Sequence, residues 1–412
     1  MRIAFFVSEF PALSQPFVLN QLAGMIERGH DVCIYATRRM PVHETHAMVR
    51  DFEMMTRTHF LYEYPRSFVL RVPHMIKRWL ASDLRRRPGI AFRCMDTRKM
   101  GRQARSLRLL SAALAIQEPR SYDVIHCQFG VLAPLVLRLK QAGAISGNVV
   151  VSIRGFDVTQ YLRDKPDFYQ SVFPQVRRFF PVSDGLKARL IQLGCPRDRI
   201  VVLRSGIDCA KFKWRERSRI PHEPLAVLSV GRLVEKKGLV YAIEAVAQLL
   251  KNGLNIRYQI AGDGPLREEL QARIDHFGIG ASVQLLGART HEQIVTLLDQ
   301  SHIFLAPSVT AADGDQEGIP NVVKEAMACG LPVISTRHSG IPELVSDGVS
   351  GFLVPERDAA ALAERITFLD HHPEAWSPVS RAARSVIERD YDQKSLTNQL
   401  ENCYRSVLYE NC

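Results

Sequence analysis

Short, nearly continuous apolar runs alternate along the chain with longer stretches that have helical periodicity. The first half has such runs at 2–8, 31–37, 123–129, 148–154, 178–183 and 199–205, and the second half at 225–231, 257–264, 283–288, 302–308, 332–336 and 351–355. Apolar strands separated by helices are typical of parallel sheets that helices cover on both faces. Two such series predict an α/β fold with two doubly wound, Rossmann-like domains.

The domain boundaries follow from a polar stretch between the two series. WRERSRIPHEP, at 214–224, contains two prolines, and we expect it to link an N-terminal domain at 1–213 to a C-terminal domain at 225–380. Residues 381–412 show no strand pattern and predict a helical segment. Doubly wound sheets bind ligands beyond the carboxyl ends of their strands, so two facing domains predict a ligand cleft between them.

The segment EGIPNVVKEAMACGLPVIST, at 317–336, predicts a helix followed by a strand. Pro320 suits the first helical turn, where a missing N–H costs nothing, and Gly330 suits the end of the helix. Helical periodicity places Lys324 and Glu325 opposite the apolar arc. Periodicity alone therefore favours a surface helix with a solvated polar face.

The start of this helix also indicates an anion site. Gly318 lets a ligand approach the backbone closely, and the free N–H groups that follow favour a phosphate. Glu317 would repel an isolated phosphate, but its carboxylate can accept hydrogen bonds from a sugar attached to that phosphate. Glu325, further along the helix, could accept from a ribose.

A second group of candidates lies in SVGRLVEKKG, at 229–238. Gly231 begins a turn that contains Arg232 and Lys237, and a guanidinium with an ammonium suits a diphosphate. Turns between strands and helices are often rich in Gly and Lys without any ligand, so a purely structural turn is the alternative.

Two further strand ends are less specific. QIAGDGPLREEL, at 259–270, lacks the spacing of a dinucleotide fingerprint and predicts a structural turn. LLGARTHEQI, at 285–294, ends a strand at a glycine. Its loop, which includes Arg289, could hold a nucleotide base.

Composition narrows the class of protein. The chain has 412 residues, of which 46% are hydrophobic and 24% charged, and this length suits two globular domains. No apolar run approaches the roughly 18 residues needed to cross a bilayer, and the start MRIAFFVSEF does not resemble a signal peptide. The eight cysteines form no C-x-x-C pair. They predict free thiols in a reducing cytoplasm, not a disulfide or zinc framework.

The charge is concentrated in one segment. Residues 66–108 contain 13 Lys and Arg against two acids, which leaves 41 basic and 41 acidic residues elsewhere. Apolar residues mixed with cations, including the run Arg85–Arg87, predict a helix that lies on an anionic membrane surface. The alternative is a solvated, partly disordered insertion. No motif supports nucleic-acid binding, so we do not expect nucleic acid as a partner.

The order of these motifs along the chain indicates a resemblance to a known family. GRLVEKKG, AGDGPLREEL, LLG and DGDQEGIPNVVKEAMACGLPVISTRHSGIPELVSDGVSGFLVP resemble the retaining glycosyltransferases of family 4, which have the GT-B fold. The resemblance covers most of residues 225–360. It implies transfer of a sugar from a nucleotide diphosphate sugar with retention of configuration and without a metal or cofactor. It also implies that Arg232 and Lys237 bind the diphosphate and Glu325 the ribose. The sugar and its phosphate would bind Glu317 and the backbone at Gly318, Ile319, Pro320 and Asn321.

The N-terminal half resembles one branch of that family more loosely. SEFPALSQPFVLNQL and VIHCQFG are similar to transferases of bacterial exopolysaccharide and colanic-acid-type assembly. This chain lacks the double glycine that many members have in the first loop, so Ser14 becomes the candidate there. Arg154 stands where the broader family often has a histidine before Gly-x-Asp. Acceptor-side candidates are Ser14, His126, Arg154 and Asp157, and His126 could instead be a packed strand-end histidine.

The expected activity is therefore extension of a lipid-linked saccharide by a cytoplasmic enzyme, peripheral on the inner face of the membrane. A sugar-nucleotide epimerase, or a non-catalytic saccharide-assembly protein on the same fold, is the alternative. Asp313 and Asp315 form D-G-D just before Glu317. These two aspartates are the one arrangement near the site that could hold a metal ion. We do not expect the activity to require a metal ion.

Overall fold

The N-terminal half of the chain forms one six-stranded parallel sheet. The computed structural model describes residues 1–11, 16–40, 47–65, 67–116, 120–219 and 222–409. The strand order is β3-β2-β1-β4-β5-β6. The strands are β1 (Arg2–Phe10), β2 (Asp31–Arg39), β3 (Thr58–Phe60), β4 (Arg120–Cys127), β5 (Ile145–Ile153) and β6 (Arg178–Pro181).

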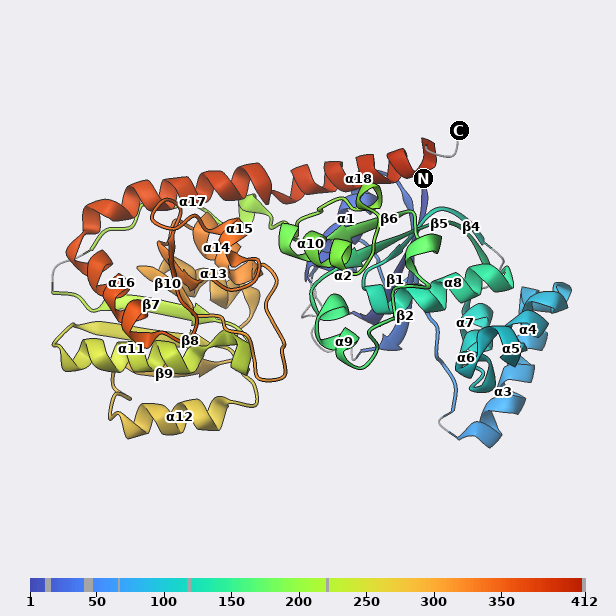
Figure 1. Cartoon of the computed structure of the whole chain (residues 1–412), viewed down its shortest axis with the longest axis horizontal. Coiled ribbons are helices and arrows are strands. Elements are labelled where there is room, and N and C mark those ends of the chain that lie inside the picture. The colour runs from blue at the N-terminus through green and yellow to red at the C-terminus, as the bar shows by residue number, and fades with distance from the viewer. Residues whose placement is uncertain (12–15, 41–46, 66, 117–119, 220–221, 410–412) are drawn as a thin grey trace.

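The C-terminal half forms a second six-stranded parallel sheet, in the order β12-β11-β10-β7-β8-β9. Its strands are β7 (Leu225–Val230), β8 (Ile256–Ala261), β9 (Val283–Gly287), β10 (Ile303–Ala306), β11 (Val333–Thr336) and β12 (Phe352–Val354). The two domains lie side by side along the long axis of the molecule (Figure 1). The predicted fold class, two doubly wound Rossmann-like domains, is confirmed.

Helices cover both faces of each sheet. The N-terminal domain has α1 (Pro16–Glu27), α2 (Ala47–Asp51), α3 (Phe68–Ala81), α4 (Pro88–Met95), α5 (Thr97–Met100), α6 (Arg102–Arg105), α7 (Arg108–Ala115), α8 (Ala133–Ala142), α9 (Gln160–Arg163) and α10 (Asp184–Gln192). The C-terminal half has α11 (Leu239–Lys251), α12 (Arg267–His276), α13 (His291–Asp299), α14 (Asn321–Ala328), α15 (Ile341–Leu344), α16 (Ala359–His371), α17 (Trp376–Asp390) and α18 (Gln393–Tyr409). Consecutive strand residues such as Phe5 and Phe6 are both fully buried, in different core clusters. Both faces of the strand are therefore covered, as a continuous apolar run predicts.

One strand was predicted wrongly and one was missed. Residues 199–205 form no strand, although Val201 and Leu203 donate backbone hydrogen bonds to Phe179 and Pro181 of β6 at 3.0 and 2.9 Å. The chain leaves the sheet here for the second domain, so its apolar residues pack without a full ladder. The sixth strand is instead β3, whose three residues are too few to give a readable pattern.

The crossing between domains lies earlier than the predicted linker at 214–224. Phe212 is already buried in the core of the C-terminal half. Arg217 donates to the carbonyl oxygens of Asp299 and Cys329, the latter at 3.0 Å. The chain therefore enters the second domain near Gly206, and the described part of 214–224 packs against that domain.

The helical C-terminal segment connects the two domains a second time. It begins with α17 at Trp376, five residues before the predicted start at 381. Figure 1 shows α17 along the C-terminal domain and α18 continuing across to the N-terminal domain. There Leu400, Tyr404 and Val407 are buried in the N-terminal core.

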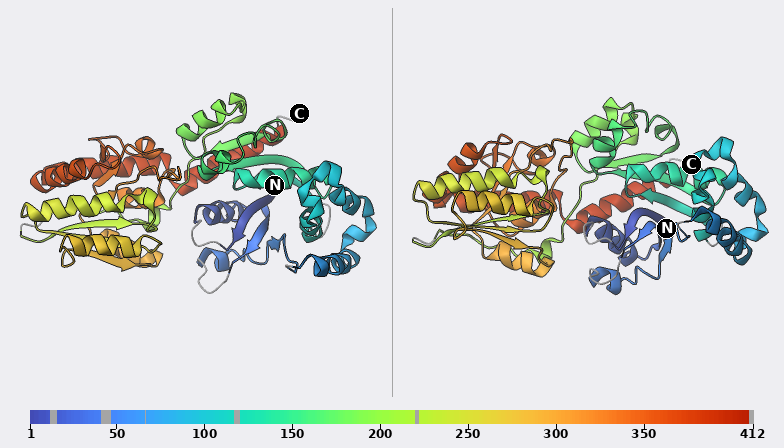
Figure 2. Two further views of the ribbon diagram at one scale, coloured as in Figure 1. Left: turned by 60° about the horizontal axis from the view of Figure 1, so that its bottom comes forward. Right: turned by 90° about the horizontal axis from the view of Figure 1, so that it is seen from below.

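The basic segment is folded where the structure describes it. It spans α3 to α7, at the end of the N-terminal domain remote from the C-terminal domain (Figures 1 and 2). Met75, Leu84 and Cys94 are buried in the core, so the alternative of a partly disordered insertion is wrong for these residues. None of the helices in the described ranges combines the length and apolarity that crossing a bilayer requires.

Candidate active site

The candidate donor site lies at the carboxyl edge of the C-terminal sheet. The strand order reverses between β10 and β7, and ligands of doubly wound sheets bind at such a switch point. A small open pocket lies there, and its lining includes the predicted residues Gly231, Lys237 and Pro320. The other lining residues are Ser229, Val230, Leu239, Leu305, Ala306, Pro307, Ser308 and Val322.

Glycines allow the loops at this edge to pack closely. A Cβ on Gly238, which has φ +61°, would lie 1.9 Å from the carbonyl oxygen of Pro307, so the loops after β7 and β10 meet at a position only glycine can occupy. A Cβ on Gly262 would lie 1.8 Å from the carbonyl oxygen of Gly231. The AGDG turn therefore supports the loop that contains Arg232, in agreement with its predicted structural role.

Glu317 and two lysines form an ionic cluster beside this pocket. The Glu317 carboxylate lies 3.1 Å from Lys237 Nζ and 3.5 Å from Lys236 Nζ, and Lys236 also lies 3.0 Å from Asp315. Burial alone would raise the pKa of Glu317, but the two lysine charges outweigh burial and hold that pKa below its ordinary value. The carboxylate is therefore ionised at neutral pH and keeps Lys237 directed into the pocket.

The helix that follows Glu317 begins without a side-chain cap. Pro320 is the N-cap residue of α14, with φ −64° and ψ 131°, and its side chain accepts no hydrogen bond. The first N–H groups of α14, from Asn321 onward, are thus left for a ligand or water. A Cβ on Gly318 would lie 3.8 Å from the carbonyl oxygen of Arg154. The predicted sugar-phosphate loop, from Gly318 through Ile319, therefore faces the N-terminal domain.

The polar face of α14 is buried, not solvated as its periodicity predicts. Lys324 is fully buried, and its Nζ donates to the carbonyl oxygen of Ser205 in the N-terminal half. Burial lowers the pKa of Lys324 to about 7, against the opposing effect of Glu325. Burial also raises the pKa of Glu325 to about 7, against the charge of Lys324. Burial thus disfavours the charged form of both side chains.

Two predicted cations lie exposed on the same edge of the sheet. Arg232 is in the loop after β7, in the same turn as Lys237, and Arg289 follows β9. β9 is the outer strand beyond β8, so Arg289 lies farther from the switch point than Arg232 does. This separation suits a ligand that extends outward from the ionic cluster.

Arg154 lies at the carboxyl end of β5, opposite the donor loop. Its guanidinium donates to the backbone carbonyl of Gln128 at 3.2 Å and to the Gln128 side chain at 2.7 Å, and it stacks on Phe17 at 3.9 Å. Burial lowers the pKa of Arg154 to about 9. The backbone of Arg154 lies close to the Gly318 loop, and its role toward an acceptor stays a prediction.

Two other acceptor-side candidates do not reach a ligand directly. The ring of His126 is fully buried, with Nδ1 2.6 Å from the Tyr404 hydroxyl and Nε2 2.8 Å from Ser152 Oγ. Asp157 is also fully buried, and it accepts from the N–H groups of Gly130 and Arg154, both at 2.9 Å. His126 is therefore a packed histidine and Asp157 joins two loops.

The remaining candidate, Ser14, lies outside the described residues.

Two residues of the site, His338 and Glu356, are not singled out by sequence reasoning. His338 is fully buried and accepts the N–H of Glu317 at Nε2, at 3.1 Å, and its Nδ1 lies 2.6 Å from Glu356. Because His338 follows β11 directly, the rule that ligands gather at carboxyl strand ends could have identified it.

Comparisons with known proteins agree with this geometry. Residues 210–386 match the family described as glycosyl transferases group 1, and residues 15–211 match glycosyltransferase family 4. The protein of Escherichia coli (strain K12) named as the colanic acid biosynthesis glycosyltransferase WcaL is 35% identical over 410 residues, which cover 99% of this chain and 100% of that protein. The amylovoran biosynthesis glycosyltransferase AmsK of Erwinia amylovora is 37% identical over 411 residues, with 97% and 98% covered.

A solved structure shares the fold. Anabaena HepE in complex with UDP-glucose has a TM-score of 0.70 and 18% identity to this chain, covering 98% of this chain and 100% of HepE. At that identity the likeness shows the fold alone. The family models and the full-length relatives show more, namely that this chain belongs to the family 4 glycosyltransferases.

Proposed function

We propose that this glycosyltransferase moves a sugar from a nucleotide diphosphate sugar to a saccharide acceptor, with retention of configuration and without a metal ion. The observation that carries the proposal is the cluster of Lys237 and Glu317 beside the uncapped start of α14. Cations and free N–H groups suit a diphosphate, whereas an ionised carboxylate suits sugar hydroxyls. The two kinds of group adjoin each other, as the two parts of a nucleotide sugar do.

Each predicted donor residue has a role in this proposal. Lys237 and Arg232 bind the diphosphate together with the backbone from Gly318 to Asn321. Glu317 orients the sugar, and Glu325 accepts hydrogen bonds from the ribose hydroxyls. Arg289, on the outer strand end, contacts the base.

The proposed reaction keeps the acceptor and the leaving group on the same face of the sugar. The acceptor hydroxyl oxygen bonds to the anomeric carbon while the bond from that carbon to the diphosphate oxygen breaks. The hydroxyl proton passes to the departing diphosphate. The main task of the protein is then to stabilise the negative charge that develops on the diphosphate, which the proposal assigns to Lys237 and Arg232.

The two aspartates of the D-G-D sequence are already engaged. Asp315 pairs with Lys236 at 3.0 Å, and Asp313 accepts from Gln160 of the N-terminal domain at 3.1 Å and from the Asp315 N–H at 2.8 Å. These partners are donors that a cation would have to displace. They support a site in which lysine, arginine and a helix terminus provide the positive charge.

The proposed acceptor is a lipid-linked saccharide in bacterial exopolysaccharide assembly. The names of WcaL and AmsK refer to colanic acid and amylovoran biosynthesis, and both are full-length relatives of this chain. An epimerase or a non-catalytic assembly protein is not favoured, because these relatives are named as glycosyltransferases.

A surface for an anionic membrane, on the cytoplasmic side, forms part of the proposal. On α3, Val69, Ile76 and Leu80 have exposed fractions of 79%, 53% and 55%. They share one face of the helix, since they lie near multiples of 3.6 residues apart. Lys77 and Arg85–Arg87 are exposed beside them. An apolar stripe beside cations suits the boundary between headgroups and acyl chains.

The test is product analysis with a panel of nucleotide diphosphate sugars and a lipid-linked saccharide acceptor. Mass spectrometry identifies the transferred sugar, and the proton coupling constant of the new anomeric centre identifies its configuration. We expect one retained glycosidic product, formed equally well in EDTA. An inverted product would contradict the proposed reaction course. Activity that disappears in EDTA and returns with magnesium or manganese would contradict metal independence.

A further inference from the structure

His338 and Glu356 connect three strand-end loops behind Glu317. His338 follows β11, Glu356 follows β12, and Glu317 lies in the loop between β10 and α14. His338 is fully buried, and its two ring nitrogens contact the other two residues, Nε2 at 3.1 Å from the Glu317 nitrogen and Nδ1 at 2.6 Å from Glu356 Oε1.

The backbone partner determines which ring nitrogen carries the proton. A backbone N–H only donates, so Nε2 of His338 must be the unprotonated acceptor. The proton of the neutral ring then sits on Nδ1 and is donated to the Glu356 carboxylate. A doubly protonated ring would direct Nε2–H at the Glu317 N–H, so this contact requires the neutral form.

Glu356 is itself fixed to the loop that contains Glu317. Its Oε2 accepts the backbone N–H of Thr310 at 2.8 Å. The Thr310 hydroxyl in turn accepts from the side chain of Gln316 at 3.2 Å. His338 and Glu356 therefore contact this loop at two points, Thr310 and Glu317, on either side of its D-G-D turn.

A close backbone approach supports the same loop from the other side. A Cβ on Gly340 would lie 2.9 Å from Ile319 Cγ1 and 3.1 Å from the carbonyl oxygen of Gly318. The segment 338–340 thus lies against the residues that follow Glu317, and any side chain at Gly340 would displace them.

We propose that His338 is a positioning residue for sugar transfer: with Glu356 it holds the backbone of Glu317 so that the Glu317 carboxylate meets Lys237 and the start of α14 faces the donor. This inference rests on the proposed function for its consequence in activity. His338 does not act on the substrate itself, because its ring is fully buried and both nitrogens have protein partners.

Three variants separate this role from simple packing. His338→Phe keeps a ring but leaves the Glu317 N–H without an acceptor. His338→Gln places an amide oxygen near the position of Nε2 and keeps the acceptor. His302→Phe is the matched control. The half-buried His302 also accepts a backbone N–H, that of Ala226 at 3.0 Å, but at the opposite edge of the same sheet.

The first measurement is amide hydrogen exchange in the ligand-free protein, followed by mass spectrometry of peptides that span 310–320. Losing one buried hydrogen bond should speed exchange in this region about tenfold in His338→Phe. Exchange should stay near the wild-type rate in His338→Gln and His302→Phe. This arm needs no substrate, so it decides the positioning role even if the proposed transfer reaction is wrong.

The second measurement is steady-state kinetics with the donor that the panel selects. We expect kcat/KM of His338→Phe to fall about tenfold to a hundredfold, as for one misplaced group in the site, with most of it restored in His338→Gln. The affinity for the sugar-free nucleoside diphosphate should also fall, but by a smaller factor than kcat/KM, because Arg232 binds the diphosphate from the loop after β7. Wild-type exchange at 310–320 in His338→Phe would overturn the proposal. A folded His338→Gln no better than His338→Phe in both measurements would also overturn it.

Discussion

Lys237 is the side chain on which the proposed chemistry depends most directly, and Arg232 lies in the same loop. A hydrogen bond between charged groups contributes about 1.5–3 kcal/mol, and more where charge develops in the transition state. We expect Lys237→Ala and Arg232→Ala each to lower kcat about tenfold to a thousandfold without loss of the fold. Steady-state kinetics and thermal melting measure the two effects.

Lys251→Ala is the control for these variants, because Lys251 is exposed at the far end of α11, the helix that follows Lys237. It should retain wild-type turnover. Near-wild-type activity in both Lys237→Ala and Arg232→Ala would contradict the assignment of the diphosphate site.

Glu317 and Glu325 are predicted to bind different parts of the donor. Glu317→Ala should spare the binding of the free nucleoside diphosphate and weaken the sugar-bearing donor. Glu325→Ala should weaken both ligands, because the ribose is common to them. Isothermal titration calorimetry with each ligand tests this division. Equal losses for both ligands in both variants would refute it.

Lys324 gives a prediction for stability as a function of pH. Its pKa is lowered from 10.5 to about 7 by burial, so the folded state binds fewer protons than the unfolded state between these values. The contribution of Lys324 to stability is therefore present above pH 10.5 and is lost as the pH falls toward 7, by at most about 1.4 kcal/mol per pH unit.

Lys324→Met removes this titration. The melting temperature of the variant, relative to that of the wild type, should consequently be highest near pH 7 and should decrease toward pH 10. Loss of the lysine charge should raise the pKa of Glu325 further in the variant. Ionising Glu325 then costs the variant more stability than the wild type as the pH rises above 7, which also lowers the relative melting temperature toward pH 10. A difference in melting temperature that stays constant from pH 7 to pH 10 would contradict the buried, titrating amine.

At the scale of the elements, the sequence predicts the long strands well but does not predict the short strand β3 or the non-strand segment 199–205. Eleven of the twelve apolar runs become strands, because a parallel strand covered on both faces must be apolar throughout. The run at 199–205 is equally apolar, but it packs beside β6 on the way out of the sheet. Local pattern does not distinguish these two ways of burying apolar residues.

The candidate donor site is predictable for a related reason. Gly231, Lys237 and Pro320 come together because parallel strands end at one edge, and strand ends can be read from the sequence. The burial of Lys324 is not predictable, since it depends on Ser205 of the other domain. The packing of His126 depends likewise on Tyr404, 278 residues away in the chain.

Helix α3 gives the prediction for membrane attachment. Each cation near an anionic leaflet contributes about 1 kcal/mol, so the basic segment should bind vesicles reversibly and release them as salt rises. We expect Ile76→Glu with Leu80→Glu to abolish sedimentation with anionic vesicles at low salt, because two carboxylates would replace apolar side chains of the stripe. The fold should survive, since both side chains are exposed. Neutralising Arg85–Arg87 should weaken the same binding.

Val349→Glu is the control for this experiment, since Val349 is equally exposed at 61% but belongs to the C-terminal domain. It should sediment as the wild type does. Donor hydrolysis should survive in all these variants, because the donor residues lie in the other domain. A wild-type protein that ignores anionic vesicles at low salt would rule out the membrane surface.

At the scale of the whole molecule, the two domains are joined at two adjacent crossings. Ile207 donates to the carbonyl oxygen of Tyr391 at 3.0 Å, and Gln393 donates back to Ile207 at 2.9 Å. A Cβ on Gly206 would lie 3.0 Å from the Tyr391 carbonyl oxygen, which explains the glycine at the crossing. Both chains thus pass between the domains as one short hydrogen-bonded bridge.

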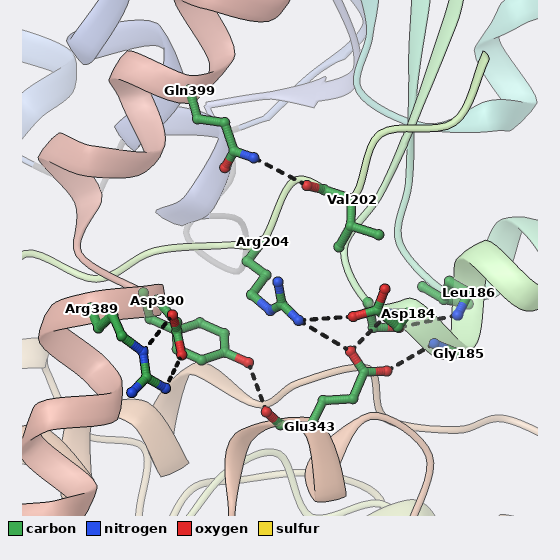
Figure 3. A network of polar contacts seen from close by, with 11 residues as sticks. Asp184, Gly185, Leu186, Val202, Arg204, Glu343, Arg389, Asp390 and Gln399 are labelled. Carbon is green, nitrogen blue, oxygen red and sulfur yellow. Dashed lines mark hydrogen bonds and ion pairs between the residues drawn. The ribbon is translucent and has the colours of Figure 1, made fainter. Parts of the chain in front are cut away.

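A polar contact beside this bridge, next to Tyr391, also holds the domains in the observed orientation. Glu343, on α15 of the C-terminal domain, accepts the N–H groups of Asp184 and Gly185 at 2.7 and 2.8 Å (Figure 3). These groups begin α10 of the N-terminal domain, where the helix dipole favours a carboxylate. Arg204 pairs with Asp184 at 2.9 Å and lies 3.8 Å from Glu343.

Glu343→Ala should therefore shift the molecule toward more open arrangements of its domains. A loss of about 1–2 kcal/mol raises the ratio of open to closed forms roughly five- to thirtyfold, while water can satisfy the N–H groups that α10 then exposes. Distances between spin labels on the two domains measure this shift. Arg389→Ala is the control, because Arg389 pairs with Asp390, the next residue of the same helix (Figure 3). An unchanged distance distribution in Glu343→Ala would show that the contact does not hold the domains together.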